Sequence, residues 1–93
     1  MARQGLQAVV RIAGTDMRVG YILRAVLERD YGHRDVCIVS MTPDGTRGVL
    51  RIVLDVLCPT VRCVPGQLGE QVLQIAQERD FDVTWMMTHA VRI

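Results

Sequence analysis

Apolar residues recur at every second position near both ends of the chain, a pattern typical of strands with one buried face. Residues 6–12 place Leu6 and Ile12 at the two ends of such an alternation, which predicts a first strand. Gly14 and the two residues after it then interrupt the pattern. The alternation returns over residues 81–89 and predicts a last strand.

Two internal segments have helical periodicity instead. From Val19 the apolar positions are separated by three, one, three and one residues, which is one stripe of an α-helix. This helix is expected to end near residues 31–32, where Gly32 suits a left-handed cap. A second stripe over 66–79, with Pro65 in the first turn and mostly glutamine outside the stripe, predicts a second helix.

The segment between the two helices reads as a hairpin. Residues 35–41 are rich in β-branched side chains and run into 42–45, where Pro and Gly fit a type I turn. A return strand over 49–56 follows, with apolar residues on one face and Arg51 and Asp55 on the other. We expect those two charged side chains to be solvated. Residues 57–64 have no clear period and are expected to form an irregular loop.

The resulting order is β-α-β-β-α-β. Right-handed crossovers place both helices on the same face of one antiparallel sheet, so this order predicts an α+β, ferredoxin-like split βαβ sandwich of two layers. With 93 residues, the chain is expected to be a single domain over 1–93. The sequence leaves open which face carries Trp85. The uncovered face is expected to present Val9, Arg11, Cys37, Val39, Met41, Val49, Arg51 and Val53.

Composition narrows the possible partners. The net charge is +1 with both signs scattered, and aromatic residues make up 4%, so a nucleic-acid partner is not expected. Hydrophobic residues reach 49% and the mean hydropathy is +0.20, which is high for so small a domain and predicts a homodimer or higher homo-oligomer formed through the sheet. No apolar run is long enough to span a membrane, and no export signal is visible, so a cytoplasmic location is expected.

The cysteines and histidines do not form a recognisable metal site. Cys37, Cys58 and Cys63 have spacings unlike those of zinc knuckles and are expected to be buried free thiols, although a bridge between Cys58 and Cys63 stays open. His33 and His89 lie far apart in the sequence. We therefore expect no metal and no cofactor.

A family resemblance rests on the glycine-rich turn and on the strands that follow it. The chain resembles the ACT domain, a regulatory module that senses small ligands. Gly14, Asp16 and Gly20 match the turn that ends the family's first strand, and Asp35 falls where the family often has Asn. The turn is one residue longer than the family's, and Val19 stands where Pro is common. The resemblance extends over about 6–88 and is carried by three runs, 10–16, 35–40 and 48–55.

The resemblance implies a non-catalytic regulatory module that binds an effector, usually an amino acid, beside this turn. The residues themselves offer suitable chemistry. Glycines and the start of a helix offer backbone donors to a carboxylate, and Arg18 adds positive charge. Asp16 and Asp35 would accept from an ammonium group. The alternative is that Asp16 serves only as a turn or cap residue.

Two other functions are compatible with the same topology. A structural oligomerisation or protein-docking domain without a ligand explains the hydrophobicity equally well. An acylphosphatase-like hydrolase would use Arg18 or Arg24 to bind phosphate, but the chain contains no Asn to orient the attacking water. The sequence therefore predicts that the protein is not an enzyme.

Overall fold

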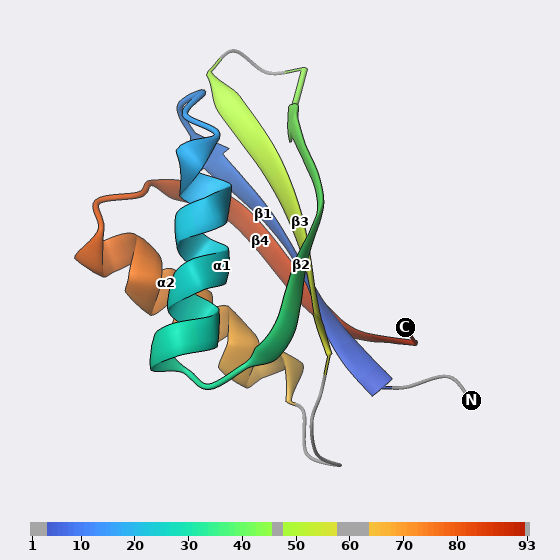
Figure 1. Ribbon diagram of the computed structural model, residues 1–93. Coiled ribbons are helices and arrows are strands. Elements are labelled where there is room, and N and C mark those ends of the chain that lie inside the picture. The colour runs from blue at the N-terminus through green and yellow to red at the C-terminus, as the bar shows by residue number, and fades with distance from the viewer. Residues whose placement is uncertain (1–3, 46–47, 58–63, 93) are drawn as a thin grey trace.

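The structure is a computed structural model that describes residues 4–45, 48–57 and 64–92. Four strands and two helices alternate along the chain in the expected order (Figure 1). The elements are β1 (Gln4–Ala13), α1 (Arg18–Asp30), β2 (Arg34–Pro43), β3 (Val49–Leu57), α2 (Pro65–Glu78) and β4 (Val83–Arg92).

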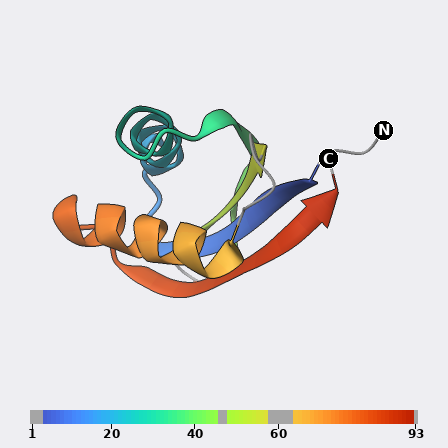
Figure 2. The ribbon, with the colours of Figure 1, turned by 90° about the horizontal axis from the view of Figure 1, so that it is seen from below.

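The strands form one antiparallel sheet in the spatial order β2-β3-β1-β4. Both helices lie on the same side of this sheet (Figure 2), with α1 packed mainly against β2 and α2 against β4 and β1. This arrangement confirms the predicted ferredoxin-like sandwich. The opposite side of the sheet, which no helix covers, is called the open face below.

The hydrophobic core lies between the helices and the sheet. The central strands β1 and β3 each supply every second residue to it, as the alternation predicted. Because each of these side chains is almost fully removed from water, each Val, Leu or Ile among them contributes roughly 1.5–3 kcal/mol of hydrophobic stabilisation, and Ala8 contributes less. The largest fully buried side chains are Leu6, Val10, Leu23, Leu27, Ile52, Leu54, Val56, Leu68, Val72 and Ile75.

Each helix is followed, two residues after its last residue, by a residue in the left-handed conformation. Gly32 follows α1 with φ +70°, as the sequence predicted. After α2 the equivalent place is taken by Asp80, with φ +58°. The amide of Phe81 donates to the carbonyl oxygen of Ala76 at 2.8 Å, which closes the last turn of α2 over Asp80.

The hairpin differs from its prediction in two respects. Strand β2 continues through Pro43, which pairs with Leu50, so the predicted turn at 42–45 is partly strand. A register shift between Ile38 and Ser40 also inserts one extra residue into β2. This bulge reverses the alternation beyond it. Met41 therefore packs against the core and not on the open face, where we expected it.

The last strand resolves the position of Trp85. Arg11 pairs with Trp85 across β1 and β4, so both side chains lie on the open face. The register then shifts between Arg11 and Ile12, and the hydroxyl of Thr84 donates to the carbonyl oxygen of Arg11 at 3.3 Å. Val83 beyond the shift packs against the core.

The cysteine prediction is wrong for Cys37, which is exposed. Strand β2 is an edge strand, and Cys37 pairs with Asp55 on the open face, where no helix covers it. Cys58 and Cys63 lie outside the described residues, as does most of the predicted loop over 57–64.

Candidate functional site

The turn between β1 and α1 is closed by its own backbone and side chains. Gly14 has φ +112°, a conformation that favours glycine, and its amide donates to the carbonyl oxygen of Gly48 in the β2–β3 hairpin. The amide of Arg18 donates to Oδ1 of Asp16 at 3.0 Å, which forms an Asx turn at the start of α1. Asp16 therefore closes this turn, which is the structural role that the sequence offered beside ligand binding.

The side chains of Asp16 and Arg18 also bind each other. Nη2 of Arg18 lies 2.8 Å from Oδ2 of Asp16, and Nε lies 3.0 Å from Oδ1, so the guanidinium contacts both carboxylate oxygens. The hydrogen bonds from the Arg18 side chain, followed by the one from its backbone amide, lower the pKa of Asp16. A ligand carboxylate or ammonium group would have to compete with this exposed pair.

Gly20 lies inside the first turn of α1, where it is buried. The side chain of Met41 crosses directly over it, with Cγ 3.3 Å and Cε 3.6 Å from the place of a Cβ atom and Sδ closer still. Glycine at this position therefore lets β2 approach α1. The side of Gly20 on which a Cβ atom would lie is thus covered by Met41.

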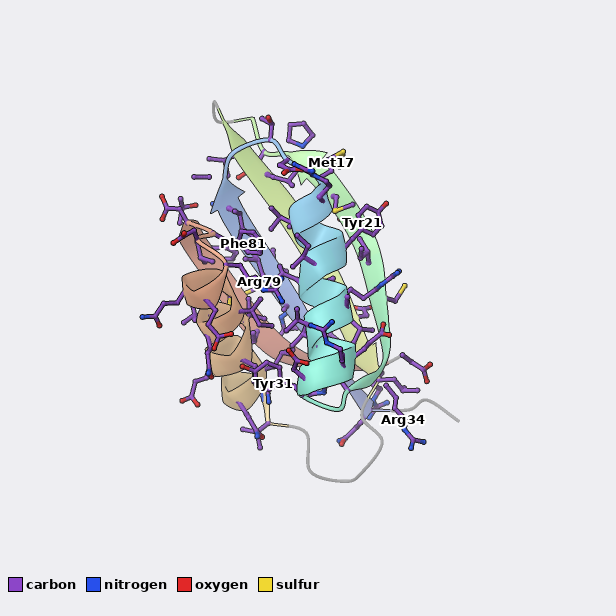
Figure 3. The ribbon with its side chains drawn as sticks, turned by 60° about the vertical axis from the view of Figure 1, so that its left-hand side comes forward. Met17, Tyr21, Tyr31, Arg34, Arg79 and Phe81 are labelled. Atoms are coloured by element: carbon purple, nitrogen blue, oxygen red, sulfur yellow. The ribbon has the colours of Figure 1, made fainter. Side chains whose placement is uncertain are left out.

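Asp35 does not join the other predicted site residues. Its neighbour Arg34 pairs with Leu57, which pairs with Gly5 at the beginning of β1, whereas the Gly14 turn follows the end of that strand. The eight residue steps from Gly5 to Ala13 correspond to about 26 Å. Figure 3 shows the same separation, with Met17 at one end of α1 and Arg34 beyond the other. The predicted set is thus divided between opposite ends of the domain.

The open face of the sheet carries a more regular arrangement of side chains than the β1–α1 turn does. Its middle is apolar, and Val9 and Val53 are only 5% and 6% exposed although no helix covers them. Met87, beside Val9 on β4, is 45% exposed. We call the four residues at this level the central row; across the sheet they are Ser40, Val53, Val9 and Met87.

Two polar rows flank the central row, one on each side along the strands. The arginine row contains Thr42, Arg51, Arg11 and Trp85. The acidic row contains Cys37, Asp55, Gln7 and His89. The sequence predicted the exposure of Arg51 and Asp55 but not these rows, because the register between strands is needed to align them.

Within the arginine row, Arg11 is held by two partners. Its Nε atom lies 2.8 Å from Oδ2 of Asp44 in the hairpin, and its guanidinium carbon lies 4.8 Å from the centre of the Trp85 ring. Within the acidic row, Nε2 of Gln7 donates to Oδ1 of Asp55 at 2.9 Å. Nδ1 of His89 is buried without a hydrogen-bond partner among the described residues.

The described residues form neither of two simple arrangements, a metal-ligand cluster and a membrane-spanning helix. Among residues 4–45, 48–57 and 64–92, no three His, Cys, Asp or Glu side chains are placed to hold a metal ion. The helices in this part of the chain are too short or too polar to cross a membrane. The open face therefore combines the exposed side chains of Met87 and Trp85 with charged groups held by their neighbours.

Comparison with known proteins adds information on the fold. No protein-family model matches the sequence, and no curated protein matches it. Among solved structures, the chain is similar to the C-terminal domain of the MgtC protein from Mycobacterium tuberculosis, determined in solution. The similarity covers 96% of this chain and 88% of that domain, with 16% sequence identity and a TM-score of 0.58. At this identity the comparison shows a shared fold.

Proposed function

We propose that this domain is a non-catalytic assembly module that self-associates through the open face of its sheet. The observation that carries the proposal is a pair of large apolar side chains exposed on that face. Met87 and Trp85 are 45% and 42% exposed on β4, and they adjoin Val9 and Val53, which neighbouring side chains already bury. Large apolar side chains that lie together on an uncovered sheet face are typical of a protein interface.

The size of the face fits a reversible homodimer. Four strands about 4.8 Å apart, each about nine residues long, give an area of about 600 Å² per copy. Two copies would then bury about 1,200 Å², which is at the lower limit for specific interfaces. The similar solved structure is itself a C-terminal domain of a longer protein, which supports an accessory role for this fold.

Sedimentation equilibrium of two matched variants tests the proposal. Met87 and Leu73 are exposed to a similar extent, 45% and 47%, but Met87 lies on the open face and Leu73 on α2. We expect Met87→Glu to weaken the dimer at least tenfold, because the interface would desolvate the new charge. Leu73→Glu should leave the dimer unchanged. A monomeric wild type, or equal effects of the two changes, would contradict the proposal.

Effector binding at the β1–α1 turn, which the ACT resemblance implies, is kept as a second proposal. The exposed guanidinium of Arg18 at the start of α1 is the group that supports it, because a ligand carboxylate could replace Asp16 there. A regulatory module of this kind should gain thermal stability with one member of a panel of amino acids and other metabolites. Arg18→Ala should remove that gain, and a flat panel would leave assembly as the function.

A further inference from the structure

Two arginines stand directly opposite each other on the open face. Arg11 and Arg51 are Cα partners across β1 and β3, and like charges in this position destabilise a sheet. Asp44 and Trp85 both contact Arg11 and offset part of the repulsion. Arg51, in contrast, forms no ion pair with any residue that the structure describes. Arg51, which is half-buried as a residue, therefore lacks a carboxylate partner within this part of its own chain.

A carboxylate in the matching position lies on the same strand. Asp55 is four residues beyond Arg51 and points to the same face, with Val53 between them. Gln7 binds Oδ1 of Asp55 and fixes the carboxylate, which leaves Oδ2 for another donor. Along β3, the open face is thus positive, apolar and then negative. A second β3 strand that runs in the opposite direction would therefore present its negative end to the positive end of the first strand.

We infer that a second copy packs on the open face about a two-fold axis that runs across the strands at the level of Val53. This inference rests on the proposed self-association. The axis places β3 over β3 of the partner subunit in the opposite direction. Arg51 of each copy then meets Asp55 of the other, and the central row meets itself. Arg11 faces the level of Gln7 of the partner subunit, which adds no like charge.

The alternative two-fold axis, parallel to the strands, is unfavourable. It would place β3 over β1 of the partner subunit, because the spatial order β2-β3-β1-β4 would be reversed. Arg51 would then meet Arg11 of the partner subunit, and the arginine rows of both copies would come together. Like charges at a desolvated interface repel each other strongly, so charge selects the axis across the strands.

The distances between packed sheets allow the proposed ion pairs. Sheets pack about 10 Å apart, a gap that a long arginine and a short aspartate can bridge from opposite sides. Aligned sheets cross at about 30°, which displaces residues two positions from the axis by about 3 Å. The flexible arginine side chain can accommodate this offset. Each dimer would contain two such pairs, related by symmetry.

A charge exchange measured by sedimentation equilibrium at low ionic strength tests the inference. We expect Arg51→Glu and Asp55→Arg each to weaken the dimer about tenfold or more, because each brings like charges together in both pairs. The double variant restores opposite charges and should return to within about threefold of the wild type. Arg79→Glu, an equal charge change at an exposed residue after α2, should leave the dimer unchanged.

Crosslinking provides a second measurement that does not depend on the charge variants. Met87 lies on β4, which the axis across the strands places over β4 of the partner subunit. In a chain with Cys37, Cys58 and Cys63 replaced by Ser, Met87→Cys should react with a short bismaleimide to give a covalent dimer. A variant with both Ser40→Cys and Met87→Cys should give no crosslink between position 40 of one copy and position 87 of the other, because these positions face each other only with the alternative axis.

The outcomes separate this inference from the proposed function. If Met87→Glu dissociates the dimer but the charge exchange fails to restore it, or Met87→Cys does not crosslink, the orientation is wrong and self-association through the open face still holds. If the wild type dimerises and Met87→Glu has no effect, the proposed function is itself wrong. Restoration by the double variant together with crosslinking at position 87 would support both.

Discussion

The guanidinium carbon of Arg11 lies 4.8 Å from the centre of the Trp85 ring, and the same side chain reaches Asp44 through an Nε to Oδ2 distance of 2.8 Å. Three segments meet in this contact: β1, the edge strand β4 and the β2–β3 hairpin. The Arg11 side chain is 41% accessible on the open face, but the Nε atom that faces Asp44 is buried. This contact fixes the position of Trp85 at the proposed interface.

We expect Arg11→Ala to destabilise the fold by about 1 kcal/mol, because it removes a partly exposed ion pair and a partly exposed cation–π contact. Arg24 provides a matched control on α1. It has the same kinds of partners at longer distances, 3.9 Å to Glu28 and 5.8 Å to the Tyr21 ring. Arg24→Ala should cost less than about half as much. Urea unfolding of both variants, at a protein concentration that keeps them monomeric, measures the difference. Equal losses of stability would show that the shorter contacts of Arg11 do not stabilise the fold more than those of Arg24.

Gly20 and Gly66 test whether the last glycine of the turn motif serves packing. Gly20→Ala would place a Cβ against the flexible side chain of Met41, so an overpacking cost of about 1–3 kcal/mol is set against a gain of up to about 1 kcal/mol from alanine in a helix, and we expect a net loss. At Gly66, in the first turn of α2, the place of a Cβ atom is open, and Gly66→Ala should be neutral or slightly stabilising. Thermal unfolding gives both values. Recovery of Gly20→Ala by Met41→Ala would confirm the contact, whereas a Gly20→Ala variant as stable relative to wild type as Gly66→Ala would contradict it.

Substitutions after the two helices should change the stability of the fold in opposite directions. Asp80 has φ +58°, a conformation that is easier for glycine, so Asp80→Gly should stabilise the fold by about 1 kcal/mol. Gly32 has φ +70° in the corresponding place after α1, and Gly32→Ala should destabilise it by about the same amount. Chemical denaturation measures both changes. Equal signs for the two substitutions would contradict the left-handed assignment of these residues.

The ion pair at the start of α1 predicts a dependence on pH. Arg18 lowers the pKa of Asp16 in the folded state, so the pair stabilises the fold above the ordinary aspartate pKa. That contribution is lost as the pH falls through the lowered pKa of the folded state. An NMR titration of the Asp16 carboxyl carbon should show a midpoint below the ordinary value. Arg18→Ala should raise the midpoint only in part, because the backbone amide at position 18 still donates to the carboxylate; an unchanged midpoint would contradict this assignment.

Element order and the buried faces of β1 and β3 follow from the sequence because they depend on local periodicity. The stripe that begins at Val19 and the alternation from Leu6 to Ile12 both describe one side of an element packed on a core. The boundaries shift by at most three residues, and several strands extend further than predicted because strands continue wherever a neighbour offers hydrogen bonds. Pro43 remains in β2 for this reason, as it pairs with Leu50.

The candidate site was less predictable, because it depends on relationships between segments. The bulge before Ser40 moves Met41 to the core, and no local pattern indicates it. The separation of Asp35 from Gly14 follows from sheet register and not from sequence spacing. The alignment of Arg51 with Arg11 has the same origin. A sequence signal existed for the open face as a whole, namely the high hydrophobic content of so short a chain.

Acrylamide quenching of the single tryptophan, measured across a range of protein concentrations, tests the central claim most directly. Trp85 lies on the open face and is 42% exposed in one copy, so its fluorescence reports whether that face becomes covered. We predict that the quenching constant falls as the concentration rises through the dimerisation range, and that it stays high in Met87→Glu. A quenching constant that does not change with concentration while the protein dimerises would show that the open face is not the interface.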